Sequence, residues 1–489
     1  MLKIKFVIVA VNVLLTLGVL LPAVHAQEIL SLEQALEIAM ENSPDMQQVR
    51  LNLERSQERL KAQKAALKSR FFLQLTPYEY NKDRRFNTLF SLWNTEELKS
   101  SSGLFAIEQP IKWTDGTLQL INRFSWQEAS SEFRQTERER SFNNNLYLSF
   151  EQPIFTYNRT KLDFKEVELD LENAALNYAI QKLFIEKSVN QSFYDLYYKQ
   201  ESLVISKEEE KNNQESYEII KKKVEAGISA KEELYQAELN LADSRSMVQN
   251  AQVELDNALD EFKNLLGISL FKTIQVLANI QHQEVSVDLD KATQNGLKQR
   301  MELRQREINL ENSMDDLTRT SALNEFKGNI SLSYGIIGTH ENFEHLYDDP
   351  TQNQKYSISF EIPLWDWGEK KARIKAQEAS IKQSELNYHQ TENDIIIEIR
   401  RAYRELKNQI LQIETRRTNV QNAQLTYDLN LERYKNGDLT SKLLGDYQTQ
   451  LSRQKLGFIQ AQIQYRLALL DLKIQSLWDF EKDASVIQE

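Results

Sequence analysis

The sequence predicts an internally duplicated protein of long α-helices and membrane-type β-strands. Three features lead to this prediction: a gapless repeat, helix-forming stretches too long for a globular core to cover, and short segments of alternating apolar residues. Residues 150–266 match residues 360–476 at a displacement of 210 positions. The matched pairs include Pro153 with Pro363, Tyr217 with Tyr427, Gly227 with Gly437, Leu241 with Leu451 and Leu259 with Leu469.

The first 26 residues are typical of a cleavable secretory signal. Lys3 and Lys5 precede an apolar run from Phe6 to Val24, and the small residue Ala26 ends the segment. The alternative is an uncleaved membrane anchor, because the apolar run is close to the shortest length that spans a bilayer. We expect cleavage after Ala26 and two repeats in the remaining chain, residues 27–286 and 287–489.

Two short helices are expected to open each repeat. Ser31 and Gln34 form a capping-box pattern before a helix over 32–41, and Ser43-Pro44 begins a second helix to about residue 70. A displacement of 257 positions relates this pair to the second repeat. The matches there are Leu32 with Leu289, Ala35 with Ala292, Leu53 with Leu310 and Glu54 with Glu311.

Alternating apolar residues then predict β-strands, within about 71–155 in the first repeat and 329–363 in the second. The clearest segments are 117–126, 144–153, 329–337 and 355–363, and aromatic residues near their ends suit membrane strands. The first repeat also carries an insert over about 73–120, whose segments 73–80 and 104–113 predict an additional hairpin. Whether this hairpin joins a barrel wall or packs outside it stays open.

Four strands cannot close a barrel, because outer-membrane barrels have at least about eight. A single chain would leave sheet edges unpaired, so we expect copies of the chain to associate. Two copies would supply eight strands and three would supply twelve, and the residues alone leave both arrangements open.

A very long helix follows the strands in each repeat, at about 156–227 and 368–437. No proline or glycine occurs between Pro153 and Gly227, and about 70 residues of helix measure roughly 100 Å. Apolar residues recur every seven positions, as in Val189, Leu196 and Leu203, which indicates a coiled-coil seam. Shorter helices return after the glycines, at about 231–266 and 441–479.

Composition argues against several other classes of protein. The chain has a net charge of −12 and no cysteine, so nothing indicates a nucleic-acid partner, a disulfide or a thiolate metal site. We expect no catalytic residue, no cofactor and no metal. The loop 338–354 gathers histidines and carboxylates that could hold a divalent ion, but a solvated acidic loop is the simpler interpretation. Its residues of this kind are His340, Glu341, Glu344, His345, Asp348 and Asp349.

The duplicated plan resembles the TolC-like outer membrane factor family over nearly the whole chain after residue 26. Motifs at both helix tips and at the corners between strand and helix carry this resemblance. They are 225-EAGIS-229 with 234-LYQA-237, 434-YKNG-437 with 443-LLGD-446, 255-LDNAL-259 with 266-LG-267, and 152-QPIF-155. Each motif is weak alone, and their order together with the duplication makes the set specific.

The resemblance implies a homotrimer in the Gram-negative outer membrane. A 12-stranded β-barrel, with four or more strands from each chain, would continue into an α-helical barrel across the periplasm. It implies passive export rather than enzymatic activity, with a periplasmic adaptor (membrane fusion) protein and an inner-membrane pump of RND or ABC type as partners. The same resemblance implies a resting state closed at the periplasmic end.

The resemblance also assigns candidate functional residues at the helix tips. The adaptor-docking candidates are Gly227, Ile228, Ser229, Gly437, Asp438 and Leu439. The constriction candidates are Asp446, Leu443 and Tyr434. The family's first constriction aspartate and its gate arginine are replaced here by Leu443 and Leu439, so we expect a single ring of Asp446 carboxylates that favours cations.

Two other functions fit part of the sequence. Within the export class, the chain could be the tunnel of a type I protein secretion system, and the sequence identifies neither the substrate nor the pump. A coiled-coil structural or adaptor protein without a pore is the alternative from another class. The two complete hairpins and the low glycine content, 13 residues in the whole chain, argue against it.

Overall fold

The computed structural model describes residues 28–88, 91–131, 138–278, 280 and 285–486. The expected signal segment, residues 1–26, lies outside this part of the chain, and so does His282. The described residues fall into two units. Among the described residues, a helical unit comprises those of 28–48, 180–299 and 395–486, and a sheet unit comprises those of 49–179 and 300–394.

The duplication expected from the sequence is confirmed in the lengths of the helices. The two longest, α4 (Arg159–Glu225) and α8 (Glu369–Asn436), contain 67 and 68 residues, and the returning helices α5 (Lys231–Leu266) and α9 (Ser441–Ser476) contain 36 each. The short helices α2 (Leu32–Asn42) and α6 (Leu289–Gln299) contain 11 each. The intermediate helices are α3 (Pro44–Ala66) and α7 (Met301–Ser321). None of the described helices is both long and apolar enough to cross a membrane.

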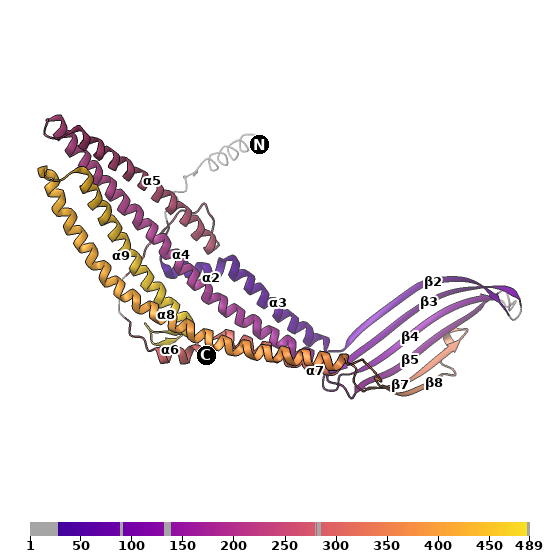
Figure 1. Cartoon of the computed structure of the whole chain (residues 1–489). Coiled ribbons are helices and arrows are strands. Elements are labelled where there is room, and N and C mark those ends of the chain that lie inside the picture. Colours follow the sequence, from indigo (N-terminus) through magenta and orange to yellow (C-terminus); the bar gives the residue numbers. More distant parts are fainter. Residues whose placement is uncertain (1–27, 89–90, 132–137, 279, 281–284, 487–489) are drawn as a thin grey trace, which may run out of the picture. The chain divides into compact units, whose positions relative to one another are not determined.

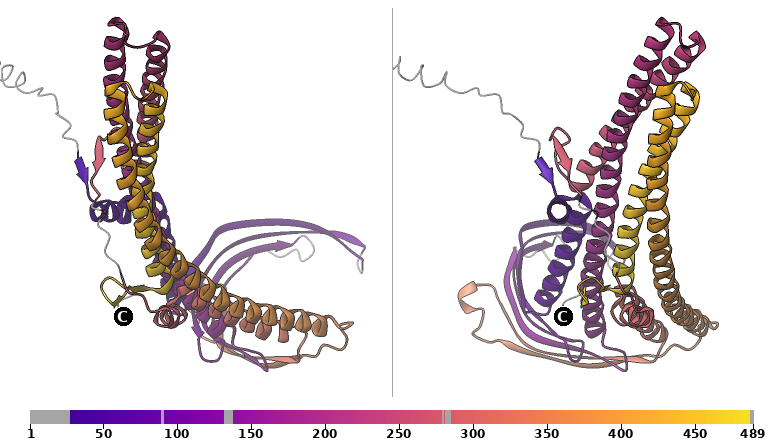
Figure 2. Two further views of the ribbon diagram at one scale, coloured as in Figure 1. Left: turned by 60° about the vertical axis from the view of Figure 1, so that its left-hand side comes forward. Right: turned by 90° about the vertical axis from the view of Figure 1, so that its left-hand side faces the viewer.

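In the helical unit, the hairpin α4–α5 runs beside the hairpin α8–α9 (Figure 2). The heptad positions form the buried seam, because a residue every seven positions stays on one side of a helix. Val189, Leu196 and Leu203 of α4 are buried, as are Ile399, Leu406 and Ile413 of α8.

The expected capping box also forms, since Ser31 Oγ accepts from the Gln34 backbone and the Gln34 side chain accepts from the Ser31 N–H. Small strands complete this unit: β1 (Glu28–Leu30) pairs in parallel with β6 (Ile274–Val276), and β9 (Trp478–Asp479) pairs with β10 (Ala484–Ser485).

The sheet unit contains one curved antiparallel sheet of six strands in the order β2-β3-β4-β5-β7-β8 (Figures 1 and 2). Four of the strands are long: β2 (Arg70–Asn87), β3 (Leu92–Ile111), β4 (Gly116–Ser131) and β5 (Glu139–Ile154). The other two are β7 (Lys327–His340) and β8 (Thr351–Glu361). The short 3-10 helix η1 (Phe343–His345) lies in the loop between them.

The described strands differ from the sequence expectation in number and in length. The additional hairpin expected in the insert of the first repeat is confirmed as β2 and β3, and its placement, which the sequence left open, is in the same sheet beside β4. The strands are also longer than their apolar segments, since strand pairing extends into polar residues such as those of 81–85. Alternation reveals only the part of a strand that has one apolar face, so it underestimated these lengths.

One face of the sheet is apolar over most of its area. Each strand contributes residues of alternate positions to this face, as β-strand geometry requires. Many of these side chains are exposed to solvent in the single chain. They include Phe71, Leu73, Leu75, Phe105, Leu118, Leu120, Leu148, Leu332, Tyr334, Tyr356, Ile358 and Phe360.

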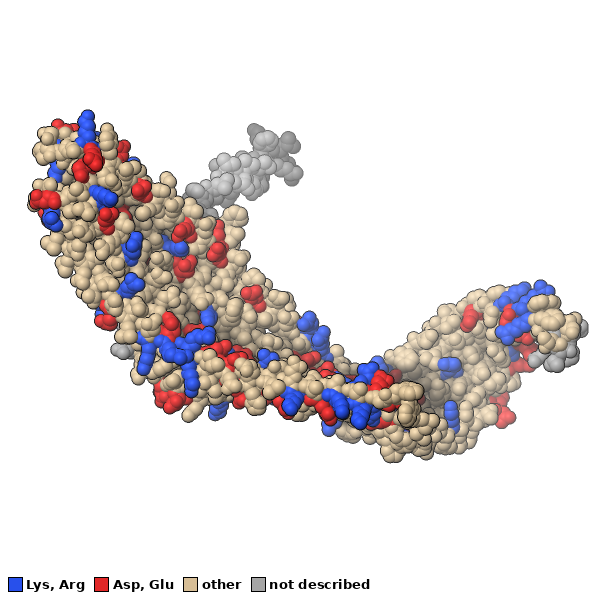
Figure 3. Space-filling model, in the orientation of Figure 1, with Lys and Arg blue, Asp and Glu red and all other residues tan. Residues whose placement is uncertain are grey.

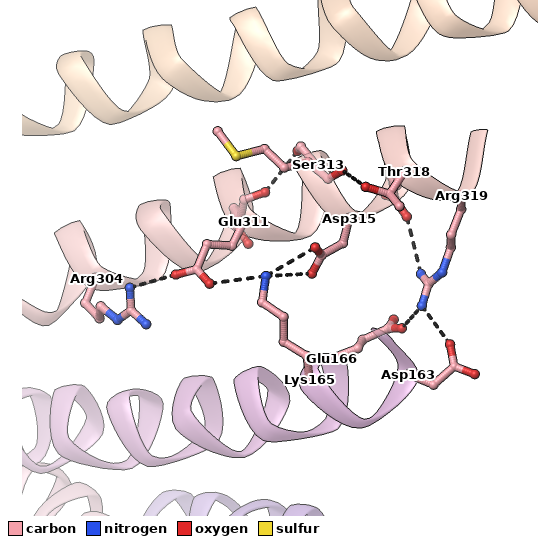
Figure 4. Close-up of polar contacts among 12 residues, drawn as sticks. Asp163, Lys165, Glu166, Arg304, Glu311, Ser313, Asp315, Thr318 and Arg319 are labelled. Carbon is pink, nitrogen blue, oxygen red and sulfur yellow. Dashed lines mark hydrogen bonds and ion pairs between the residues drawn. The ribbon is translucent and has the colours of Figure 1, made fainter. Parts of the chain in front are cut away.

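Ion pairs join α4 to α7 inside the sheet unit (Figure 4). Arg304 of α7 makes two hydrogen bonds to the Glu172 carboxylate of α4, at 2.6 and 3.0 Å. Further along, Lys165 lies 3.0 Å from Asp315, and Arg319 lies 3.1 Å from Asp163. The two helices run antiparallel, because rising residue numbers on α7 meet falling numbers on α4.

Candidate functional site

The two helix tips have the same backbone geometry. Gly227 follows α4 with φ of +74°, and Gly437 follows α8 with φ of +94°. At each tip the N–H after the glycine reaches back five residues, from Ile228 to the Lys223 carbonyl at 2.8 Å and from Asp438 to the Arg433 carbonyl at 2.9 Å. This pattern is a Schellman motif, in which glycine readily adopts the left-handed conformation that ends a helix.

The tip residues are open to solvent in the chain described here. A side chain added at Gly227 or Gly437 would meet nothing within 4 Å, and Ile228 has 75% of its surface exposed. Asp438 is exposed, whereas Ser229 and Leu439 are half-buried. Leu439 packs against a buried cluster shared by the two hairpins. The structure therefore leaves most of the docking candidates free for a partner.

The two tips are staggered along the helix axes. By the internal repeat, Tyr434 of α8 is equivalent to Val224 of α4, yet its hydroxyl contacts the carbonyl of Ser216. Ser216 lies eight residues before Val224 on α4. The tip of α4–α5 therefore projects beyond the tip of α8–α9 (Figure 2).

Tyr434 lies buried between the hairpins, with 1% of its surface exposed. Its hydroxyl donates to the Ser216 carbonyl at 3.1 Å and lies 3.3 Å from Ser441 Oγ. Its own carbonyl accepts a hydrogen bond from Lys223 Nζ at 2.8 Å. Burial raises the pKa of the Tyr434 hydroxyl, so it stays protonated and able to donate.

The other two constriction candidates lie on one exposed face near the start of α9. Leu443 has 45% of its surface exposed, and Asp446 is also exposed. Residues three apart in a helix are neighbours on its surface. The structure thus brings Leu443 and Asp446 together and separates them from the buried Tyr434.

Sequence reasoning did not identify the polar residues that link the hairpins near these tips. Glu233 of α5 accepts a hydrogen bond at 2.7 Å from the backbone N–H of Ser441, and Asn240 of α5 donates to the Ser441 carbonyl at 3.2 Å. Their partners are backbone atoms more than 200 positions away, which no helical period reveals. Farther along, Lys455 Nζ contacts Glu208 at 2.9 Å, and Thr449 Oγ1 donates to Glu209 at 3.0 Å.

The acidic loop contains local contacts of its own. His345 Nδ1 lies 2.7 Å from the Asp348 carboxylate, and the Asn342 N–H donates to His340 Nδ1 at 2.9 Å. Within the described part of the chain, no group of three histidine or carboxylate side chains is arranged to hold a metal ion.

A sheet with one exposed apolar face, joined to long paired helices, defines the fold class of outer-membrane channels. Comparison with known families agrees with this class. The family described as outer membrane efflux protein matches residues 118–268 and 292–474, together more than half of the chain. The chain therefore belongs to the outer membrane efflux protein family.

Solved structures share this fold at low sequence identity. The Campylobacter jejuni CmeC outer membrane channel is 16% identical with a TM-score of 0.70, and the match covers 94% of this chain and 87% of that chain. The outer membrane protein VceC from Vibrio cholerae is 15% identical with a TM-score of 0.65, covering 91% and 94%. The Neisseria gonorrhoeae MtrE outer membrane channel, in its open state, is 13% identical with a TM-score of 0.66, covering 92% and 90%. No curated protein sequence matches the chain.

Proposed function

We propose that three copies of this chain form the passive outer-membrane duct of a tripartite efflux system. The sheets would form the barrel in the outer membrane, and the long hairpins would form a tunnel across the periplasm. The observation that carries this proposal is the sheet itself, which has an exposed apolar face and an unpaired strand at each edge among the described residues. Such a sheet needs lipid against its face and identical copies at its edges.

The hairpin tips would dock a periplasmic adaptor, which connects the duct to an inner-membrane pump of RND or ABC type. Two features support this role for the tips. The longer tip exposes an apolar side chain, Ile228, and the glycines leave the backbone accessible. An exposed apolar residue at the leading end of a hairpin suits a contact with a partner.

The same region would hold the constriction of the duct. Leu443 and Asp446 share an exposed face of α9, so three copies around an axis would place three of each side chain in a ring. A ring of carboxylates attracts cations and repels anions. Tyr434 would hold in place the hairpins that carry this ring, because its hydrogen bonds link one hairpin to the other.

Planar lipid bilayers provide the direct test of the duct. We expect the purified protein, expressed with its leader, to insert and to give stepwise ionic currents, and chemical cross-linking in detergent to stop at three chains. A water-soluble monomer without conductance would refute the proposal. Loss of the gene should sensitise cells to small toxic compounds, whereas a defect confined to a secreted protein would favour the type I secretion alternative.

A further inference from the structure

We propose that each chain contributes six strands to the membrane wall, so that three copies close an 18-stranded barrel with β8 of one chain paired to β2 of the next. This inference rests on the proposed function, because it presumes the trimeric pore. The strands involved are the six of the single sheet, including the β2–β3 hairpin that the first repeat carries and the second lacks.

The β2–β3 hairpin is continuous with the rest of the wall. The ladder between β3 and β4 runs from Glu96 opposite Ser131 to Ile111 opposite Gly116, without a shift in register. Moving the hairpin outside the wall would break this entire ladder and leave its N–H and C=O groups unpaired. In a hydrocarbon environment each unpaired group costs several kcal/mol.

The apolar face also crosses the hairpin without interruption. On β2 it consists of Phe71, Leu73 and Leu75, and on β3 of Phe105 and Ile107, which lie opposite Leu73 and Phe71. The opposite face of β2 and β3 is mixed at the same level, since Gln74, Thr76, Ser102 and Glu108 share it with Phe72, Leu104 and Ala106. The face that carries Phe71, Leu73 and Leu75 is therefore the more continuous apolar face of the hairpin, as expected for strands that meet lipid.

The free edges of the sheet are complementary in direction. An even number of antiparallel strands leaves the two edge strands running in opposite directions, so β8 can pair antiparallel with β2 of a neighbour. The first residue of β2, Arg70, and the last residue of β8, Glu361, lie at the same end of the sheet. Pairing between copies would therefore extend the pattern already present within the chain.

One register matches both the faces and the charges of these edges. With Arg70 opposite Glu361, the apolar residues of the two edges coincide: Phe71 with Phe360, Leu73 with Ile358 and Leu75 with Tyr356. A guanidinium opposite a carboxylate in an antiparallel pair is favourable. In the single chain Arg70 pairs with Glu108 and Glu361 pairs with Lys327, but the Arg70 and Glu361 side chains stay 61% and 71% exposed, so each could add a contact to a neighbour.

The stagger of the strands fits a closed barrel in this register. A row of paired residues that starts at Arg70 passes through Glu108, Gln119, Ser149 and Ser333 and reaches Lys355, six residues before the end of β8. Six residues of shift for six strands, at about 3.3 Å per residue and about 4.8 Å between strands, give a tilt of roughly 35°. Membrane barrels have tilts of about 35–45°.

The part of β2 that extends past β8 is protected by charge. In this register β8 reaches the level of Tyr80, and Lys82, Asp83, Arg84 and Arg85 lie beyond it. Charged side chains gather at this end of the sheet (Figure 3). Charges along an exposed edge prevent further strand pairing, as expected where the wall rises out of the membrane.

Disulfide trapping tests the closure directly, because the natural chain has no cysteine. We expect the double variant Leu73→Cys with Ile358→Cys to give, on oxidation, chains linked in a ladder that ends at three. The matched control Leu73→Cys with Ser359→Cys places the second thiol on the opposite face and should not link. A second pair, Phe71→Cys with Phe360→Cys, should also link, so a failure caused only by local distortion at the first pair can be recognised.

The alternative wall has four strands per chain, in which β8 would meet β4 of the neighbour. Cross-linking of Leu120→Cys with Ile358→Cys would show that arrangement and overturn the 18-stranded wall. A ladder that stops at two chains, or conducting pores without any β2–β8 link, would overturn it as well. These outcomes leave the duct intact, whereas protein that forms neither links nor pores would instead contradict the proposed function.

Discussion

The hydroxyl of Tyr434 on α8 donates a hydrogen bond to the backbone carbonyl of Ser216 on α4, at 3.1 Å. This contact joins the two hairpins across more than 200 positions of sequence, and Tyr434 shares a buried cluster with Leu444, the residue after Leu443. Because Tyr434 is buried in the cluster that also contains Leu444 and Leu451, its loss would loosen the hairpins at the proposed constriction.

We predict that Tyr434→Phe makes the duct open more readily. The change removes a buried hydrogen bond worth about 1 kcal/mol and keeps the aromatic packing. Single-channel recordings should show a longer mean open time or a larger conductance. Tyr427→Phe is the matched control, because Tyr427 lies in the same cluster and no hydrogen bond from its hydroxyl is seen among the described residues. Equal behaviour of the two variants would argue against a gating role for Tyr434.

Asp446→Asn should reduce the preference of the duct for cations. The substitution removes three negative charges from the proposed ring while keeping the size of the side chain. Reversal potentials measured across a salt gradient should move toward zero. Asp438→Asn, which removes an exposed carboxylate at the tip, is the control, and a shift as large in this variant would show that general surface charge sets the selectivity.

Ile228→Asp should weaken docking of the adaptor by about tenfold or more, equivalent to about 1.4 kcal/mol. A carboxylate at this position would be buried against the partner without a counter-charge. Binding of the adaptor to the purified duct, measured by biolayer interferometry, checks this expectation. Ile228→Val keeps an apolar side chain and should bind normally. Normal binding of Ile228→Asp would place the docking surface elsewhere.

The ion pair between Arg304 and Glu172 makes stability depend on pH. The Arg304 hydrogen bond lowers the pKa of Glu172 below its ordinary value. A carboxylate with a lowered pKa in the folded state stabilises the fold above its ordinary pKa, and this stabilisation is lost as the pH falls through the lowered value. We expect Glu172→Gln to lower the melting temperature at pH 7, by an amount equivalent to about 1 kcal/mol or less.

The difference between Glu172→Gln and the natural protein should shrink toward zero as the pH falls through the lowered pKa of Glu172, below which both are uncharged at this position. Melting curves followed by circular dichroism across this range measure it. Glu307→Gln is the control, because the ion pair of Glu307 seen in the described part of the chain is with Arg304 of the same helix, α7. A difference in melting temperature that stays constant with pH would mean that the charge of Glu172 contributes nothing to the stability of the fold.

The long helices were predictable because their determinants are local. The stretch without proline or glycine before Gly227 and the seven-residue spacing of Val189, Leu196 and Leu203 depend only on neighbouring positions. The seam residues are buried, as expected. The strand segments were located for the same reason, although polar residues hid their full lengths.

The stagger of the tips was not predictable from these patterns. A heptad seam allows two hairpins to pack in several registers that differ by whole turns. The register observed here depends on contacts such as Glu233 with the Ser441 N–H and Lys223 with the Tyr434 carbonyl. Each of these involves a backbone atom, so residue types alone carry no signal for it.

The sequence by itself determined the duplication, the four long helices of the two hairpins and the membrane character of the strands, because periodicity and residue type fix local structure and the face it buries. Only the tertiary structure decided that β2 and β3 join the same sheet as β4, that Tyr434 is buried between the hairpins, and which residues of the two hairpins lie side by side. Those features depend on pairing between distant segments, and several pairings satisfy the same local pattern until packing and hydrogen bonds select one.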